Sequence, residues 1–201
     1  MKETSILAEE FEKIQDGDLL AIIDFFETNE DSLLSKNSNE LGEIEYIYID
    51  YLVALLDKSR YSKILEIIEK IEKLDEFQKY RNLDLDFDED LRFYKYSSLF
   101  YKRRYKESKI GFQKLLKDYP KNEDYQGWLI DSKKRISNRI FGISMYSAGG
   151  LLFLIVAIRL YWNPPLLDTL NRIAEVLFVL SIGLYFIDLK RKRKLKIKEE
   201  I

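Results

Sequence analysis

The chain of 201 residues contains no cysteine and no histidine, and only three prolines. Without these two residue types it can form no disulfide and has no Cys/His zinc site, no thiol nucleophile and no histidine base. Catalysis would depend on carboxylates, lysine, tyrosine or serine alone, and no glycine-rich phosphate loop is present. We therefore expect neither an enzyme nor a protein that binds a metal or another cofactor.

Charge is divided unevenly along the chain. Residues 1–130 contain 20 basic and 29 acidic residues, whereas residues 131–201 contain 13 basic and 6 acidic ones. An acidic first part and a basic, apolar second part predict two regions in different environments. The polar, acidic start, MKETSILAEEFEK, does not resemble a signal peptide.

Long apolar runs occur only in the last third of the chain. The stretch 140–158 has 19 residues without a charge. As a helix rising about 1.5 Å per residue, it crosses a hydrocarbon core of roughly 30 Å. We predict a first transmembrane helix over 140–162, preceded by a basic juxtamembrane helix over 131–139. The alternative is a buried helix of a soluble core.

A second transmembrane helix is predicted at 169–189, after a short outer loop at 163–168. Only 12 of its residues, 176–187, form a charge-free stretch. That length is too short to span alone, so a re-entrant or interfacial helix is the alternative. Charges near membrane depth tend to be functional, and the candidates at the membrane interface are Arg159, Asp168, Arg172 and Glu175.

Basic residues flank the two apolar segments on the same side. They are Lys133, Lys134, Arg135 and Arg139 before the first segment and the tail 190–201, which begins KRKRKLKIK, after the second. The positive-inside rule then predicts an integral membrane protein with both termini in the cytoplasm. The tail is expected to meet anionic lipid headgroups of the bilayer rather than nucleic acid.

Two further expectations concern assembly and source. Ser144 and Ala148 have the small-xxx-small spacing that lets helices approach in lipid. They fit packing within the hairpin, and a homo-oligomer through the membrane hairpin stays open. Richness in lysine, isoleucine, tyrosine, asparagine and glutamate is typical of an AT-rich microbial genome, and we place the chain in a bacterial inner membrane.

The first 130 residues have apolar side chains at three- and four-residue steps, which is typical of helices. They contain no long stretch in which apolar and polar residues alternate as in a strand. Helices are expected near 3–15, 18–28, 40–58, 61–78, 88–103, 105–118 and 123–139. The last of them is expected to continue into the first apolar segment. The predicted fold class is therefore all-α.

The acidic segment Asp84 to Asp90 alternates its carboxylates as a calcium-binding loop does. Glu89 stands where such a loop needs glycine, and Lys95 stands where it needs its final glutamate. We expect these acids to stabilise the start of the following helix instead, because negative charge is favourable at a helix N-terminus.

The segment Arg103 to Pro120, RRYKESKIGFQKLLKDYP, resembles the second helix of a tetratricopeptide repeat. Tyr105 takes the place of the opening aromatic, Ser108 the small residue and Phe112 the second aromatic. Weaker copies are Tyr61, Ile64 and Ile68, and Leu19, Ile22 and Phe26. Their spacings of 42 and 44 residues exceed the roughly 34 of the family, and Tyr96 replaces a small residue of its first helix.

The resemblance implies that residues 1–130 form a cytoplasmic domain of degenerate tetratricopeptide-like helical hairpins, followed by the transmembrane hairpin. Such stacks bind a peptide or a partner protein on a concave face. The candidate partner-binding aromatics are Tyr94, Tyr96, Tyr101, Tyr105 and Phe112, with ordinary helix packing as the alternative.

Two functions fit this plan. The first is a membrane-anchored scaffold that recruits a protein partner to the cytoplasmic face of a bilayer. The alternative is a membrane effector of the bacterial defence or toxin type. Its hairpins would oligomerise to disrupt the bilayer on a signal that the helical domain senses.

Overall fold

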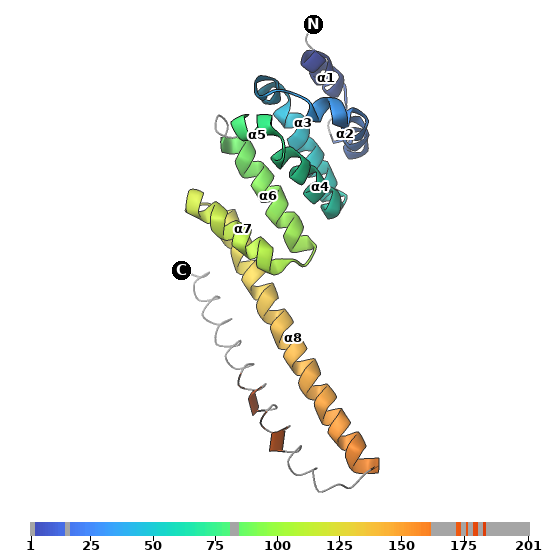
Figure 1. Cartoon of the computed structure of the whole chain (residues 1–201), viewed down its shortest axis with the longest axis vertical. Coiled ribbons are helices and arrows are strands. Elements are labelled where there is room, and N and C mark those ends of the chain that lie inside the picture. Colours follow the sequence, from blue (N-terminus) through green and yellow to red (C-terminus); the bar gives the residue numbers. More distant parts are fainter. Residues whose placement is uncertain are drawn as a thin grey trace. The chain divides into compact units, whose positions relative to one another are not determined.

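The computed structural model describes residues 3–14, 17–80 and 85–161, together with Arg172, Ile173, Val176, Val179, Leu180 and Gly183. These described residues form eight helices and no strand, which confirms the all-α prediction. The helices are α1 (Glu3–Phe11), α2 (Leu19–Leu34), α3 (Ser38–Asp57), α4 (Tyr61–Glu72), α5 (Asp75–Tyr80), α6 (Leu85–Tyr101), α7 (Tyr105–Asp118) and α8 (Glu123–Tyr161) (Figure 1). The chain divides into two compact units, Met1–Ser132 and Lys133–Ile201.

Helix α3 is the centre of the first unit, because α1, α2, α4, α5 and α6 all pack against it. Its residues Tyr48 and Tyr51 are almost completely buried. The ring of Tyr51 stacks on that of Phe26 from α2, with centroids 3.9 Å apart and planes inclined by 3°. Burial of such large apolar surfaces is the main favourable term in folding the unit.

Side-chain caps define three of the helix starts. Asp18 accepts a hydrogen bond from the Ala21 amide at 3.1 Å and so caps α2. Asn37 and Glu40 form a reciprocal capping box at the start of α3. Asn122 caps α8 by accepting from the Tyr125 amide at 3.2 Å, which confirms the break predicted there.

Some helix boundaries differ from the predicted ones. The second helix continues to Leu34 instead of ending near residue 28. The single helix predicted over 61–78 is in fact two, because the chain tightens at Lys73 and Leu74 before α5 begins. Asp75 and Glu76 lie in the first turn of α5, where negative charge favours a new helix start.

The acidic segment and the long last helix follow the predictions. Asp86 and Asp88 lie in the first turn of α6, while Asp84 lies outside the described residues. Helix α8 continues without a break from Glu123 to Tyr161. The predicted helix over 123–139 therefore does run into the first apolar segment.

A repeated turn precedes three helices of the first unit. Among the described residues, positive φ angles occur only at Gly17 (83°), Ser59 (57°) and Arg103 (60°). Each stands two residues before the start of α2, α4 or α7. The last two turns also share a hydrogen bond of 2.8 Å, from the amides of Arg60 and Arg104 to the carbonyls five residues earlier.

The helices that follow these turns place equivalent residues in the core. Phe26, Ile68 and Phe112 are all 0% exposed. They occupy matching positions in α2, α4 and α7, seven residues after the helix start. The structure thus contains multiple helical hairpins, and α2, α4 and α7 begin 42 and 44 residues apart.

Candidate functional site

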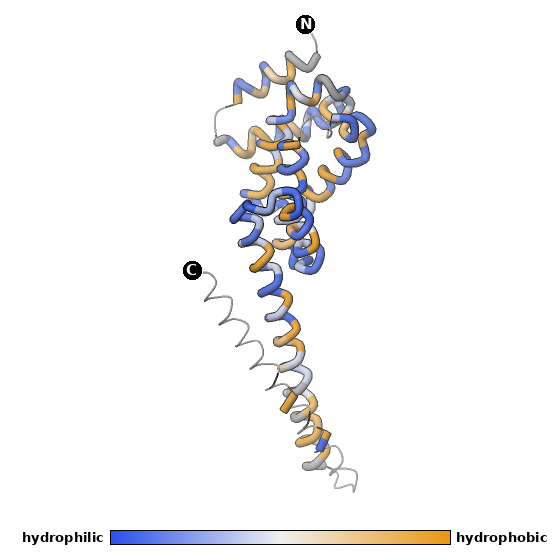
Figure 2. Tube along the Cα trace, turned by 90° about the vertical axis from the view of Figure 1, so that its left-hand side faces the viewer, coloured by the Kyte–Doolittle hydropathy of each residue, from blue (hydrophilic) through white to orange (hydrophobic). Residues whose placement is uncertain are grey.

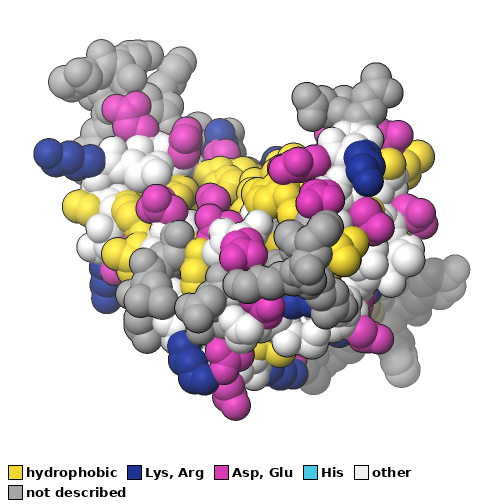
Figure 3. Space-filling view, turned by 90° about the horizontal axis from the view of Figure 1, so that it is seen from above, with side chains coloured by type: hydrophobic (Ala, Val, Ile, Leu, Met, Phe, Trp, Pro, Cys, Tyr) yellow, Lys and Arg dark blue, Asp and Glu magenta, His cyan; other side chains and the backbone are white. Residues whose placement is uncertain are grey.

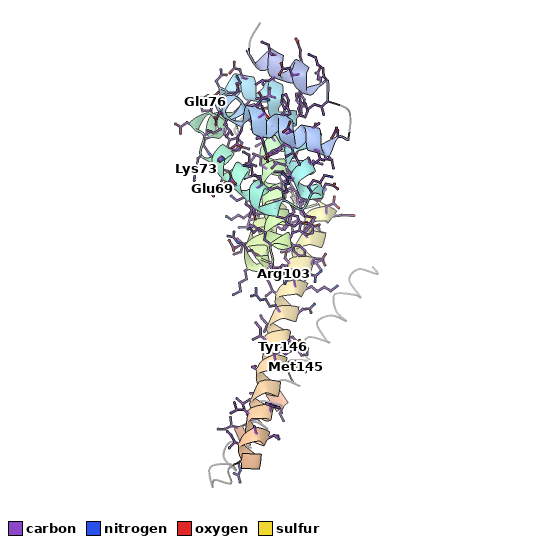
Figure 4. The ribbon with its side chains drawn as sticks, turned by 90° about the vertical axis from the view of Figure 1, so that its right-hand side faces the viewer. Glu69, Lys73, Glu76, Arg103, Met145 and Tyr146 are labelled. Carbon is purple, nitrogen blue, oxygen red and sulfur yellow. The ribbon has the colours of Figure 1, made fainter. Side chains whose placement is uncertain are left out.

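The C-terminal half of α8 exposes apolar side chains over most of its surface. At 100° per residue the exposed positions cover about two thirds of the circumference, and Ile155, which is 6% exposed, lies in the remaining sector. They are Ile140, Ile143, Met145, Tyr146, Leu151, Phe153, Leu154 and Val156. Tyr146 and Phe153 are 83% and 77% exposed, and Figure 4 shows Met145 and Tyr146 on this helix. Within the described residues α8 is the one helix long and apolar enough to cross a membrane.

This exposure bears on the alternative of a buried helix in a soluble core. A helix that is apolar all round belongs either in a core or in lipid. Only 6% of the most apolar window of α8 is buried. Monomeric soluble proteins rarely expose contiguous apolar patches beyond a few hundred Å². The apolar half of α8 is therefore mostly exposed and, by length and composition, able to cross a membrane.

Polarity changes sharply along α8. Lys133, Lys134, Arg135 and Arg139 are exposed on the side that precedes the apolar stretch. In Figure 2 the trace of α8 turns from mixed colours to predominantly hydrophobic ones towards its C-terminal end. Basic side chains next to an apolar helix are the residues that meet lipid headgroups on the cytoplasmic side of a membrane.

The predicted interface charges fall mostly outside the described residues. Arg159 belongs to the last turns of α8, but its side chain is not among those described. Arg172 is exposed, and Asp168 and Glu175 lie outside the described part of the chain. The outer loop, the tail and most of the second apolar segment also lie outside it, so the second transmembrane helix stays a prediction.

Four of the five candidate aromatics of the first unit lie where α6, α7 and α8 meet, whereas Tyr94 packs against the main core. Phe112 is fully buried and stacks on Trp128 of α8, with ring centroids 5.5 Å apart. In this position Phe112 is a packing residue. Trp128 is the residue that the sequence analysis missed, because a single tryptophan at the start of α8 has no repeat position to mark it.

Tyr96 explains the departure from the repeat pattern. A Cβ atom built on Gly111 would lie only 2.1 Å from the Tyr96 Cδ1 atom. The large side chain on α6 is therefore accommodated by a residue without a side chain on α7. The repeat pattern marks Tyr96 in the sequence but not Gly111, because the fit between them depends on how the two helices pack.

The remaining aromatic candidates differ in exposure. Tyr94 and Tyr105 are partly buried, the latter packing edge-on against Phe100 at 5.2 Å. Tyr101 is 45% exposed and stacks on Tyr61 with ring centroids 4.8 Å apart. Of the five predicted residues, Tyr101 offers the most surface to a partner.

A cavity of about 620 Å³ lies beside the turn between α3 and α4, and charged side chains surround it. Arg60 lies 3.7 Å from Glu27, and Lys63 lies 3.6 Å from Glu30. The Lys102 amine donates to the Ser62 hydroxyl at 2.6 Å. Its charges of opposite sign face one another, so this cavity favours no particular ion.

A second cavity, of about 450 Å³, lies between α1, α2 and α3 and has apolar walls. We call it the α1–α3 groove. It is lined by Phe11, Glu12, Ile14, Gly17, Leu19, Ile22, Tyr46, Asp50 and Val53. Both charged residues in this lining are acidic. The sequence gives no sign of the groove, because its residues come from three helices and match no motif.

The described residues thus offer an exposed apolar helix, a half-exposed aromatic pair and an apolar groove with an acidic rim. They include no group of three or more acidic side chains arranged to hold a metal ion. No protein family, no curated protein and no solved structure matches this chain.

Proposed function

We propose that this chain is a membrane-anchored helical-repeat scaffold that recruits a protein partner to the cytoplasmic face of a bilayer. The observation that carries the proposal is the apolar half of α8, with Tyr146 and Phe153 among its most exposed side chains. A helix satisfies all its backbone hydrogen bonds internally, so hydrocarbon is a favourable solvent for such a segment. The exposed lysines and arginines that precede it support a cytoplasmic position for the first unit.

The repeated turns support the scaffold half of the proposal. Helices α2, α4 and α7 start at spacings of 42 and 44 residues, each after a residue with positive φ. Stacked helical hairpins present long surfaces to partner proteins, as tetratricopeptide-like domains do. That analogy concerns the architecture alone. The chemical nature of the partner has to be inferred from a particular surface of this chain.

Single-cysteine labelling tests the anchor, because the natural chain has no cysteine. Lys121→Cys lies in an exposed turn of the first unit, and Asn163→Cys lies in the predicted outer loop. A membrane-impermeant maleimide should label the first variant only in inverted vesicles and the second only in right-side-out vesicles. Release of the protein from membranes by alkaline carbonate, or labelling of Lys121→Cys from outside, would refute the proposed topology.

A dye-release assay separates the scaffold from a membrane effector. The scaffold proposal expects reconstituted vesicles to retain an entrapped dye when the purified chain is present. Release that Arg159→Ala or Glu175→Ala abolishes would instead favour an effector whose intramembrane charges act. An unrelated membrane protein, reconstituted at the same protein-to-lipid ratio, gives the background rate of dye release.

A further inference from the structure

The α1–α3 groove has the size and walls of a binding site. Its volume of about 450 Å³ lies within the range of roughly 300–1,000 Å³ that small-ligand pockets occupy. Ile14, Leu19, Ile22 and Val53 supply aliphatic surface, and Val53 is 40% exposed in the C-terminal part of α3. An apolar side chain that enters the groove would remove this surface from water.

Tyr46, which lines the groove, carries an unsatisfied polar group. Its hydroxyl is shielded from solvent and has no hydrogen-bond partner. Its ring is held edge-on by Phe11, with centroids 5.6 Å apart. A buried polar group without a partner costs about 1–3 kcal/mol. A ligand that approaches Tyr46 with a hydrogen-bonding group would recover that loss.

The charge of the groove selects the sign of its ligand. Glu12 and Asp50 are its two charged lining residues, and both are exposed. Burial first, and then the charges of these two carboxylates, raise the pKa of Tyr46. The carboxylates therefore act on the same hydroxyl. Seen from above, the first unit shows hydrophobic side chains gathered in a hollow with acidic side chains around it (Figure 3).

We propose that the α1–α3 groove binds a cationic segment of a partner protein that carries an apolar side chain next to a lysine or arginine. The apolar side chain lies against Leu19, Ile22 and Val53. The neighbouring ammonium or guanidinium group donates hydrogen bonds to the carboxylates of Glu12 and Asp50 and, once binding displaces the groups that shield it, to the Tyr46 hydroxyl. The inference rests on the proposed scaffold function, because it names the surface and the chemistry of the recruited partner.

Fluorescence anisotropy tests the groove on the full chain in nanodiscs of zwitterionic lipid. The probe is a fluorescein-labelled peptide of lysine, leucine and alanine with leucine and lysine adjacent. Asp50→Lys should weaken binding about tenfold, because it replaces an attractive charge by a repulsive one. Asp57→Lys is the matched control, since it makes the same change on the same helix outside the groove lining and should leave the affinity unchanged.

Tyr46→Phe separates binding from folding. It keeps the ring and removes the unsatisfied hydroxyl, so the thermal midpoint should stay the same or rise while the affinity falls about threefold to tenfold. If Tyr46 served only to stabilise the fold, the thermal midpoint and the peptide affinity would both fall. That result would overturn its role in binding.

An acidic peptide and a second copy of the chain are the alternative occupants that test the proposal. A peptide with glutamate in place of lysine should not bind, and equal binding of it would overturn the proposal. Wild-type binding by Asp50→Lys, or a groove-dependent dimer in place of peptide binding, would do the same. Peptide binding by a chain that fails the topology test would leave the groove proposal intact and remove only the anchor.

Discussion

Leu20 in α2 and Leu154 in α8 are both 60% exposed, yet their surroundings differ completely. Leu20 is an isolated apolar residue on a helix whose other apolar positions, such as Ile23 and Phe26, face the core. Leu154 belongs to a stretch that is apolar on every side. A single exposed leucine is normal on a soluble surface, whereas a helix without a polar face is not.

The same contrast holds between α4 and the apolar half of α8. Helix α4 buries Ile64, Ile67, Ile68 and Ile71 on one side and carries its lysines and glutamates on the other. Its apolar residues therefore follow the three- and four-residue steps of an amphipathic helix. Under the proposed function the two kinds of helix lie in two different solvents.

Alkaline pH should have the largest effect and should act on the first unit. Burial raises the pKa values of Tyr48 and Tyr51, and burial together with Glu89 raises the pKa of Tyr119 to about 12. The Tyr48 hydroxyl donates to the Leu33 carbonyl at 2.7 Å, which a phenolate cannot do.

The direction of this pH effect follows from the raised pKa values. The folded state holds these protons more tightly than the unfolded state, whose tyrosines titrate near pH 10. Their stabilisation is complete below about pH 10 and is lost as the pH rises through the folded-state values. Near-UV circular dichroism should show that the first unit unfolds cooperatively. Far-UV circular dichroism of the vesicle-bound chain should still show the helical signal of the apolar segment. An unchanged near-UV spectrum at about pH 12 would contradict this.

Leu55→Ala and Leu154→Ala make the same change in the two environments. Leu55 is 0% exposed, so its truncation leaves a cavity and should cost about 2–5 kcal/mol of unfolding free energy. Leu154→Ala leaves no protein cavity and should change that free energy by less than about 0.5 kcal/mol. Urea unfolding followed by tryptophan fluorescence measures both. Equal losses would mean that Leu154 is packed within the protein.

Leu154→Arg and Leu20→Arg compare the two solvents directly. An arginine at the centre of a membrane-spanning helix raises the apparent free energy of insertion by about 2.5–3.5 kcal/mol. The same residue on the water-exposed side of α2 should have an effect within about 0.5 kcal/mol. A membrane-integration assay on the two variants gives the difference. Equal integration would show that α8 does not use lipid as its solvent.

The difference between the amphipathic α4 and the apolar half of α8 can be predicted from the sequence. The packing between the helices of the first unit is harder to predict. The charge-free length of 140–158 and the amphipathic steps of α4 are local patterns, and both the helices and the uninterrupted α8 follow from them. The break at Lys73 and Leu74 was missed because the apolar steps continue across it to Phe77. Asp75 and Glu76 are the signal of a helix start that marks it in the sequence.

Contacts between distant residues are the part that a single sequence does not predict. Gly111 and Tyr96 are each unremarkable in their own helices, and only the packing of α7 on α6 makes them complementary. The α1–α3 groove depends in the same way on three helices. The unsatisfied Tyr46 hydroxyl leaves no trace in the sequence pattern, because its environment and not its spacing makes it unusual.

Gly111→Ala should destabilise the first unit by about 1–3 kcal/mol, because the new methyl group overlaps the Tyr96 ring. Gly127→Ala and Gly142→Ala are matched controls, since nothing lies within 4 Å of a Cβ at either position. Both controls should be neutral or stabilising by up to about 1 kcal/mol, as expected for alanine in a helix. Thermal unfolding measures all three. Tyr96→Ala should restore the stability of Gly111→Ala in part, and full additivity of the two changes would refute their contact.

Glu69→Gln should have the smallest effect, although its partner Lys73, the residue that follows α4, lies only 2.7 Å away (Figure 4). Both side chains are about 70% exposed, at 68% and 71%, and water and salt screen such pairs. The unfolding midpoint of this variant should not move measurably at physiological salt. Ile68→Val, on the buried side of the same helix, should instead cost about 0.5–1.5 kcal/mol. If the glutamine variant lost more stability than the valine variant, charge pairing rather than apolar burial would hold α4 in the first unit.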